Sequence, residues 1–162
     1  MNGAIKLLIV DDEREYLEAL AERLGMRGFE VRIAENGSAA LDLCVEEKFD
    51  LALVDLKMPG MDGHELLTNL KAEHRFLEVI MLTGHGSSGS AFDCARSGAF
   101  AYLPKPYIID ELMLVLRDAY RQRLARKFAS HQEQLHELAK AFQGATAQDI
   151  LRRMRELDDG DR

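Results

Sequence analysis

Cysteine and long apolar segments are scarce in this sequence of 162 residues. The two cysteines, Cys44 and Cys94, lie far apart and lack the spacing of a metal site, which disfavours a disulfide framework and favours a reducing compartment. No stretch approaches the roughly 20 apolar residues of a membrane span. The N-terminus also lacks the apolar segment and cleavage site of a secretory signal. We therefore expect a cytoplasmic protein that makes no membrane contact.

Proline is also rare, with 3 residues against 12 glycines, while 47% of the side chains are hydrophobic and 30% are charged. This composition is typical of neither a disordered nor a collagen-like chain. The length suits one domain with an appendage, or two very small domains, and suffices to bury a core.

The charge is unevenly distributed along the chain. The first 120 residues carry 12 basic and 21 acidic side chains, a net charge of −9, and the last 42 carry 9 and 7, a net charge of +2. An acidic body does not attract nucleic acid through its own field. The charge therefore disfavours nucleic acid as a partner, and the change near residue 120 marks a candidate domain boundary.

Five short apolar runs predict β-strands, and helical patterns separate them. The runs are 5–10, 29–34, 51–54, 79–82 and 100–103. This alternation predicts an α/β fold with a parallel sheet. The first, third and fourth runs lack polar alternation and are expected in the centre of the sheet, whereas Glu30 and Arg32 make the second an edge strand.

Chemically informative side chains follow four of the predicted strands. Asp11 and Asp12 follow the first, Asp55 the third, Thr83 the fourth and Lys105 the fifth. Ligands of such sheets bind beyond the carboxyl ends of the strands. Two carboxylates about 4 Å apart repel each other by roughly 4 kcal/mol at an effective dielectric constant near 20. A bound Mg²⁺, which prefers oxygen ligands, relieves that repulsion.

These residue types suit phosphoryl transfer to a carboxylate. Asp55 is the natural nucleophile, and Asp11 and Asp12 are the natural metal ligands. Lys105 supplies a positive charge for phosphoryl oxygens, and the hydroxyl of Thr83 donates a hydrogen bond to another.

The motifs around these residues resemble those of the receiver domain of two-component response regulators. They are Asp11-Asp12-Glu13, residues 51–63 (LALVDLKMPGMDG), Met81-Leu82-Thr83-Gly84, Arg96-Ser97-Gly98-Ala99-Phe100 and Tyr102-Leu103-Pro104-Lys105-Pro106. The resemblance covers about residues 4–120 with every motif in order. It implies a flavodoxin-like (βα)5 doubly wound sheet with strand order 2-1-3-4-5.

The resemblance also implies a role for each site residue. Asp55 would accept a phosphoryl group from a sensor histidine kinase or a histidine phosphotransfer protein. Asp12, Asp55 and the backbone carbonyl of Lys57 would bind Mg²⁺, with Asp11 acting through water. Lys105 would contact the phosphoryl group, and its peptide bond to Pro106 is expected to be cis.

A conformational switch is implied in the same way. On phosphorylation Thr83 would turn inward and Tyr102 would follow, which would reshape the surface around the fourth helix, fifth strand and fifth helix for a downstream effector protein. Lys57 and His85 occupy variable positions that tune the lifetime of the acyl phosphate in the family, and their identity predicts no rate.

Two other classes compete with this signalling switch, which is not an enzyme in the usual sense. A Mg²⁺-dependent phosphohydrolase with an aspartyl-phosphate intermediate typically has a second acid/base aspartate close after the nucleophile. Lys57 stands at that place. A receiver-like domain that never takes up phosphate is disfavoured because Asp55, Thr83 and Lys105 are all present.

The last part of the chain, 122–162, is predicted to be a helical tail on a receiver domain of residues 1–121. A helical pattern runs from 110 to 143, and positions 124, 128, 131, 135, 138 and 142 form a heptad seam with His131 as its polar member. A further short helix is expected from about Thr146.

We favour homodimerisation through this tail. One alternative is a docking helix for a separate output protein. The other is an element whose Arg152, Arg153 and Arg155 contact nucleic acid.

Overall fold

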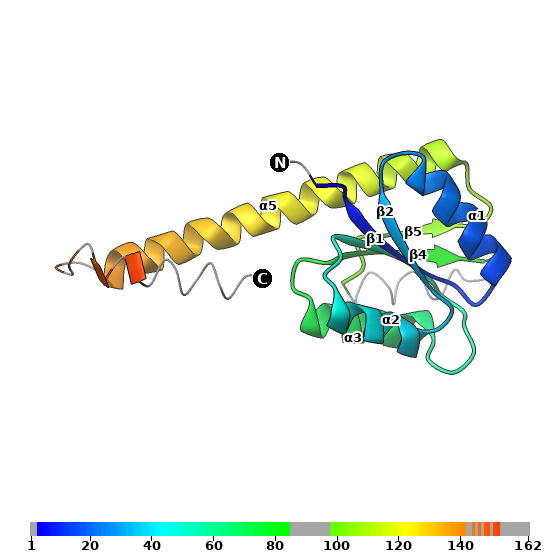
Figure 1. Ribbon diagram of the computed structural model, residues 1–162, viewed down its shortest axis with the longest axis horizontal. Helices are drawn as coiled ribbons and strands as arrows, with labels where there is room; N and C mark the ends of the chain where they lie inside the picture. The colour runs from blue at the N-terminus through cyan, green and yellow to red at the C-terminus, as the bar shows by residue number, and fades with distance from the viewer. Residues whose placement is uncertain are drawn as a thin grey trace. The chain divides into compact units, whose positions relative to one another are not determined.

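The computed structural model contains one parallel sheet of five strands in the order β2-β1-β3-β4-β5 (Figure 1). The residues that the structure describes are 3–84, 98–141, 144, 146, 148, 149, 151 and 152. The strands are β1 (Lys6–Val10), β2 (Glu30–Ala34), β3 (Leu51–Asp55), β4 (Glu78–Thr83) and β5 (Ala101–Pro104). The helices are α1 (Arg14–Gly25), α2 (Gly37–Glu46), α3 (Gly63–Glu73) and α5 (Ile109–Ala141). The expected fold class and strand order are confirmed.

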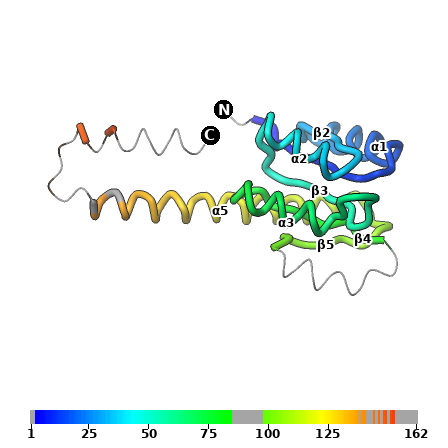
Figure 2. The backbone as a smooth tube through the Cα atoms, turned by 90° about the horizontal axis from the view of Figure 1, so that it is seen from below, coloured from blue at the N-terminus to red at the C-terminus, as the bar shows by residue number. Residues whose placement is uncertain are grey.

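Helices cover both faces of the sheet, because alternate residues of each strand point to opposite sides. On β1, Leu7 and Ile9 belong to the core cluster that includes buried residues of α1 and α5. Leu8 and Val10 belong to the other cluster, with buried residues of α2 and α3. Figures 1 and 2 show these layers from two directions. Each fully buried leucine contributes about 1.5–3 kcal/mol, so both faces stabilise the sheet.

The predicted positions of the strands within the sheet are also correct. All residues of β3 and β4 are buried, as expected for central strands covered on both sides. β2 forms one edge, and its Glu30 and Arg32 are exposed.

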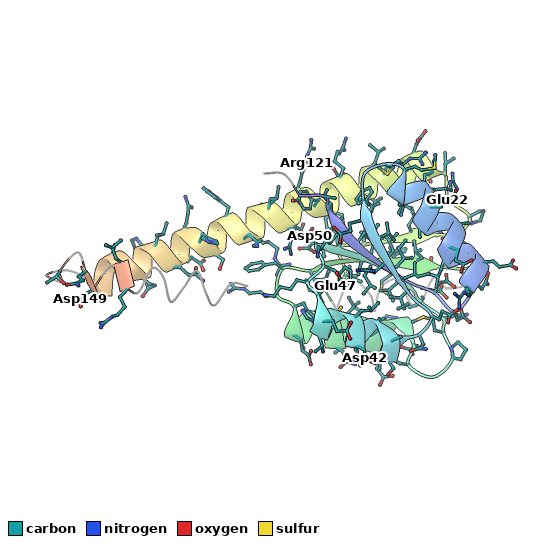
Figure 3. All side chains as sticks on the ribbon, in the orientation of Figure 1. Glu22, Asp42, Glu47, Asp50, Arg121 and Asp149 are labelled. Atoms are coloured by element: carbon teal, nitrogen blue, oxygen red, sulfur yellow. The ribbon has the colours of Figure 1, made fainter. Side chains whose placement is uncertain are left out.

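The amino-terminal edge of the sheet is fastened by Asp50, which Figure 3 labels. Its carboxylate accepts a hydrogen bond from the backbone N–H of Lys6 at 2.9 Å and pairs with Arg123 Nε at 3.0 Å. Arg123 also donates to the carbonyl oxygen of Phe76 at 2.7 Å. These bonds tie α5 to the strands at Arg123, about four turns after the helix begins at Ile109, and Arg123 is the last residue of the compact unit Met1–Arg123.

A second compact unit comprises Leu124–Arg162. Within it, the helical pattern predicted up to 143 is observed as α5 up to Ala141. Residues 148, 149, 151 and 152 are helical, and the remainder of the predicted last helix lies outside the described residues. His85, Cys94, Arg96, Ser97 and Phe142 lie outside them as well. Among the residues that the structure describes, no helix is long and apolar enough to cross a bilayer.

Candidate functional site

Three carboxylates meet at the carboxyl end of the neighbouring strands β1 and β3. Asp11 and Asp12 follow β1 directly, and Asp55 is the last residue of β3, which pairs with β1. One oxygen of each carboxylate lies within 4.8 Å of the others. Asp11 is 1% exposed and Asp55 is 9% exposed, whereas Asp12 is exposed to solvent. The strand order brings the three together because β1 and β3 are neighbours at its reversal point.

Lys105 completes the cluster from the end of β5. Its Nζ lies 2.7 Å from Asp11 Oδ2 and 3.6 Å from Asp55 Oδ1. The backbone N–H of Lys105 donates to the carbonyl oxygen of Thr83 at 2.6 Å, which continues the pairing of β5 with β4. The peptide bond between Lys105 and Pro106 is cis, as expected. A single ammonium group therefore contacts two of the three carboxylates.

Local hydrogen bonds hold Asp11 in place. Its Oδ1 accepts from the backbone N–H of Glu13 at 2.9 Å, at the residue that precedes α1. Its Oδ2 accepts from Lys105. Both oxygens of this buried carboxylate are thus satisfied within the protein, which offsets the cost of burying its charge.

The site shifts the protonation equilibria of its own groups. The pKa of Asp55 is raised to about 6, chiefly by burial; the positive charge of Lys105 opposes this rise, and the negative charges of Asp11 and Asp12 add to it. Burial also opposes the charge of Lys105, but its bond to Asp11 and the charge of Asp55 outweigh burial, so the pKa of Lys105 is raised. Near neutral pH the ammonium group of Lys105 is charged. Asp55 is then an anion, and burying its charge costs free energy.

The other predicted site residues lie around this cluster. Thr83 is the buried last residue of β4, at the same edge of the sheet as Asp55. Lys57 lies in the loop after β3 with an exposed side chain. Tyr102 lies on the outer strand β5, and 46% of its surface is exposed. The structure thus brings Asp11, Asp12 and Asp55 together, with Lys105 in contact with Asp11 and Asp55, and places the other three residues on adjoining segments.

Gly63 packs directly behind Asp55. A Cβ atom at this position would collide with the carbonyl oxygen of Asp55 and would lie 2.7 Å from Cα of Leu56. The N–H of Gly63 donates to the carbonyl oxygen of Leu56 at 2.9 Å. The absence of a side chain therefore lets the first turn of α3 approach the end of β3 that carries the candidate nucleophile.

Two tyrosines beside Lys105 were not predicted as site residues. The ammonium nitrogen of Lys105 lies 4.3 Å from the centre of the Tyr16 ring, and the hydroxyl groups of Tyr16 and Tyr107 form a hydrogen bond. Both tyrosines also line a cavity of about 440 Å³ next to Lys105. Tyr16 appeared in the sequence as one apolar position of a helix, and Tyr107 follows Lys105 by two residues. Only the packing of α1 against the loop after β5 brings them together.

Comparison with known proteins decides the family. The family model of the response regulator receiver domain matches residues 7–117, which is more than half of the 162 residues. The chain belongs to the response regulator receiver family. Receivers of this family are signalling modules of two-component systems. The acidic cluster at the carboxyl edge of the sheet and, except for Lys6, the five strands described above lie within the part of the chain that matches the family.

Individual relatives and a solved structure are consistent with this family. The receiver described here is similar to the regulatory protein AtoC of Escherichia coli K12, with 34% identity over 134 residues, 83% of this chain and 29% of AtoC. It is 37% identical over 122 residues to sporulation initiation phosphotransferase F of Bacillus subtilis, covering 75% of this chain and 95% of that protein. A crystal structure of a response regulator receiver domain protein from Clostridium thermocellum matches with a TM-score of 0.72 and 31% identity, over 75% of this chain and 98% of that one.

Some of the relatives are much longer than their matching part. The chain spans 29% of AtoC and 25% of the response regulator protein FleR of Pseudomonas aeruginosa. The similarity to these relatives therefore concerns the receiver and not the remainder of their chains.

Proposed function

We propose that Asp55 accepts a phosphoryl group from a sensor histidine kinase or a histidine phosphotransfer protein, in a reaction that depends on Mg²⁺. The observation that carries this proposal is the placement of Lys105 Nζ, 2.7 Å from Asp11 and 3.6 Å from Asp55, beside three carboxylates within 4.8 Å. The nucleophile and the charges needed for a phosphoryl group lie at one edge of the sheet. Phosphorylation then switches the receiver's contacts with a downstream partner protein.

In the transfer step an oxygen of the Asp55 carboxylate attacks phosphorus. An O–P bond forms while the P–N bond to the donor imidazole breaks, and the leaving nitrogen keeps the electron pair and takes up a proton from solvent. Lys105 offers its ammonium group to an oxygen of the transferred phosphoryl group, and Thr83 offers its hydroxyl to another. The receiver promotes this step on its own side chain and is not an enzyme with turnover.

The donor set fits a hard divalent cation. We propose that Asp12, Asp55 and the backbone carbonyl of Lys57 hold Mg²⁺, with Asp11 acting through water. Carboxylate and carbonyl oxygens are the ligands this ion prefers, and it commonly keeps several waters. When bound, the ion neutralises negative charge on the carboxylates and on phosphoryl oxygens.

The switch that we propose uses Thr83 and Tyr102. Thr83 lies buried beside the strand of Asp55, so a hydrogen bond from its hydroxyl to a new phosphoryl group requires a local rearrangement. Tyr102 lies on the adjacent strand, where Met81 of β4 pairs with it. Tyr102 is 46% exposed; in this proposal its ring turns inward as Thr83 moves, which would change the surface that an effector protein contacts.

For the tail we propose pairing with a second copy of the chain, with residues 1–121 as receiver and 122–162 as dimerisation element. On α5, Leu124, Phe128 and Leu135 are 49%, 66% and 52% exposed. Together with exposed His131 they follow the heptad spacing that favours a helical partner. Small or uncharged residues accompany the seam at 125, 132 and 134, so two identical helices can approach without a row of like charges.

The test of the phosphoacceptor proposal measures the stoichiometry of bound phosphate. The full chain is mixed with Mg²⁺ and radiolabelled acetyl phosphate, and protein-bound label is followed over time. We expect up to one equivalent of phosphate that is stable in acid and labile in base, as an acyl phosphate is, and none when EDTA replaces Mg²⁺.

Two variants control this measurement. Asp55→Asn should take up no label, whereas Asp42→Asn, the same change at an exposed position of α2 (Figure 3), should behave as wild type. Continuous release of inorganic phosphate in many-fold excess over protein would instead identify a phosphohydrolase. Equal labelling of wild type and Asp55→Asn would exclude Asp55 as the acceptor.

A further inference from the structure

Lys105 rests on an aromatic face as well as facing two carboxylates. Its Nζ lies 4.3 Å from the centre of the Tyr16 ring. Tyr16 lies in the first turns of α1, which follows Asp11 and Asp12 along the chain. The same ammonium group therefore has contacts from the end of β1, the end of β3 and α1.

The ring of Tyr16 is itself held. Its hydroxyl group is hydrogen-bonded to the hydroxyl of Tyr107, which comes from the loop between β5 and α5. Both side chains are partly buried against the core cluster of α1 and α5. The Tyr16 ring is thus fixed at one end by core packing and at the other by a hydrogen bond.

A lysine needs such support in this position. Its side chain has four rotatable methylene groups and ends in a compact charge without a preferred direction. The side chain of Lys105 is 25% exposed, so water competes for the ammonium group. The negative face of an aromatic ring attracts a cation and also restricts where it can lie. Asp11, the nearest carboxylate, would otherwise draw the ammonium group away from Asp55.

We propose that Tyr16, oriented by Tyr107, is a positioning residue that holds the Lys105 ammonium group where it reaches both Asp11 and Asp55. This inference rests on the proposed function, because the position of Lys105 affects phosphoryl uptake only if Asp55 is the acceptor. Tyr16 does not contact the phosphoryl group itself; it acts through Lys105. The ring face carries this effect, and the hydroxyl of Tyr16 contributes by fixing the ring.

The kinetic test compares two substitutions in the full chain. Tyr16→Leu removes the ring face, and Tyr16→Phe keeps it. With acetyl phosphate and Mg²⁺ we expect Tyr16→Leu to slow labelling of Asp55 about 3- to 10-fold, the range of a partly desolvated cation–π contact, while Tyr16→Phe stays within about 2-fold of wild type. Urea unfolding curves confirm that each protein is folded under the assay conditions.

Tyr120→Leu is the matched control. Tyr120 of α5 is partly buried against the same core cluster, so this variant loses a comparable core ring outside the contacts of Lys105. We expect its labelling rate to equal that of wild type. If Tyr120→Leu and Tyr16→Leu slow labelling equally, Tyr16 has only a packing role and the inference is wrong.

A second readout does not depend on phosphorylation. Protons above an aromatic ring resonate upfield, so NMR of the Lys105 ε-methylene should show upfield shifts in wild type and Tyr16→Phe that disappear in Tyr16→Leu. If no protein takes up phosphate but these shifts behave as expected, the proposed function fails and the contact of Lys105 with the Tyr16 ring stands. If wild type is phosphorylated on Asp55 and Tyr16→Leu changes neither rate nor shift, the inference alone is overturned.

Discussion

The carboxylate of Asp55 lies in a buried environment that disfavours its ionised form. Burial, reinforced by Asp11 and Asp12 and opposed by Lys105, raises its pKa from 3.8 to about 6. The same group in the unfolded chain ionises near 3.8. Between these two pH values the unfolded state has released a proton that the folded state keeps, so stability falls as pH rises through this window and changes no further above it.

Replacing Asp55 by asparagine should therefore stabilise the protein in the absence of divalent cations. A shift of two pKa units corresponds to about 3 kcal/mol, and after a discount for partial solvent screening we expect Asp55→Asn to raise the free energy of unfolding by roughly 1–2 kcal/mol at pH 7.5. Urea unfolding in EDTA at several pH values measures this difference. It should shrink as pH falls from about 6 to about 4.

Asp42→Asn serves again as control, because Asp42 is exposed on α2. It should leave the unfolding free energy unchanged across the same pH range. An Asp55→Asn protein that is less stable than wild type at pH 7.5 in EDTA would contradict the view that burial outweighs the attraction of Lys105.

At the scale of elements, the junction between β3 and α3 determines where Asp55 lies. Gly63 is the first residue of α3, and no side chain fits between it and the Asp55 carbonyl. Met58-Pro59-Gly60 has residue types typical of a turn, and α3 begins shortly after it at Gly63. This sequence pattern does not reveal the close approach, which depends on the angle at which α3 leaves the sheet.

Gly63→Ala should thus displace either α3 or the end of β3. We expect a loss of about 1–3 kcal/mol in the free energy of unfolding, typical of overpacking, and slower labelling of Asp55 by acetyl phosphate. Gly25→Ala is the control: Gly25 ends α1, and a Cβ there would meet no atom within 4 Å. This control should be neutral or slightly stabilising. Equal stability of the two variants would show that the junction tolerates a side chain.

At the scale of the whole molecule, the apolar seam on α5 predicts self-association. Leu135→Asp places a charge in the seam, whereas Ala129→Asp places the same charge next to it on an exposed position. We expect sedimentation equilibrium to show a dimer for wild type and Ala129→Asp and a monomer for Leu135→Asp, since each apolar side chain of this size contributes about 1.5–3 kcal/mol when buried.

His131 offers a test in the opposite direction. It is the polar member of the seam, so His131→Leu should strengthen the dimer. Wild type and His131→Leu that both remain monomeric, with and without phosphorylation, would exclude the dimer and favour a docking helix for a separate output protein. A dimer that persists in Leu135→Asp would place the interface on the receiver instead.

The local sequence determined which segments form strands and helices and which strand lies at an edge of the sheet. The five strand segments, the edge strand with Glu30 and Arg32 and the long helix after the fifth strand were all predicted, because the spacing of apolar residues indicates both the type of element and its buried face. The strand order, carried over from the family resemblance, placed Asp11, Asp12, Asp55 and Lys105 at one edge of the sheet, and the observed contacts between them agree with that placement.

Tertiary structure alone decided how these groups are supported. The contact of Tyr16 with Lys105 joins residues far apart in the chain, and so does the bond of Arg123 to Asp50. The space at Gly63 depends on the angle at which α3 packs against the end of β3. Such features arise from the packing of side chains across elements, and a pattern of apolar and polar positions specifies which face is buried but not which neighbour a side chain meets there.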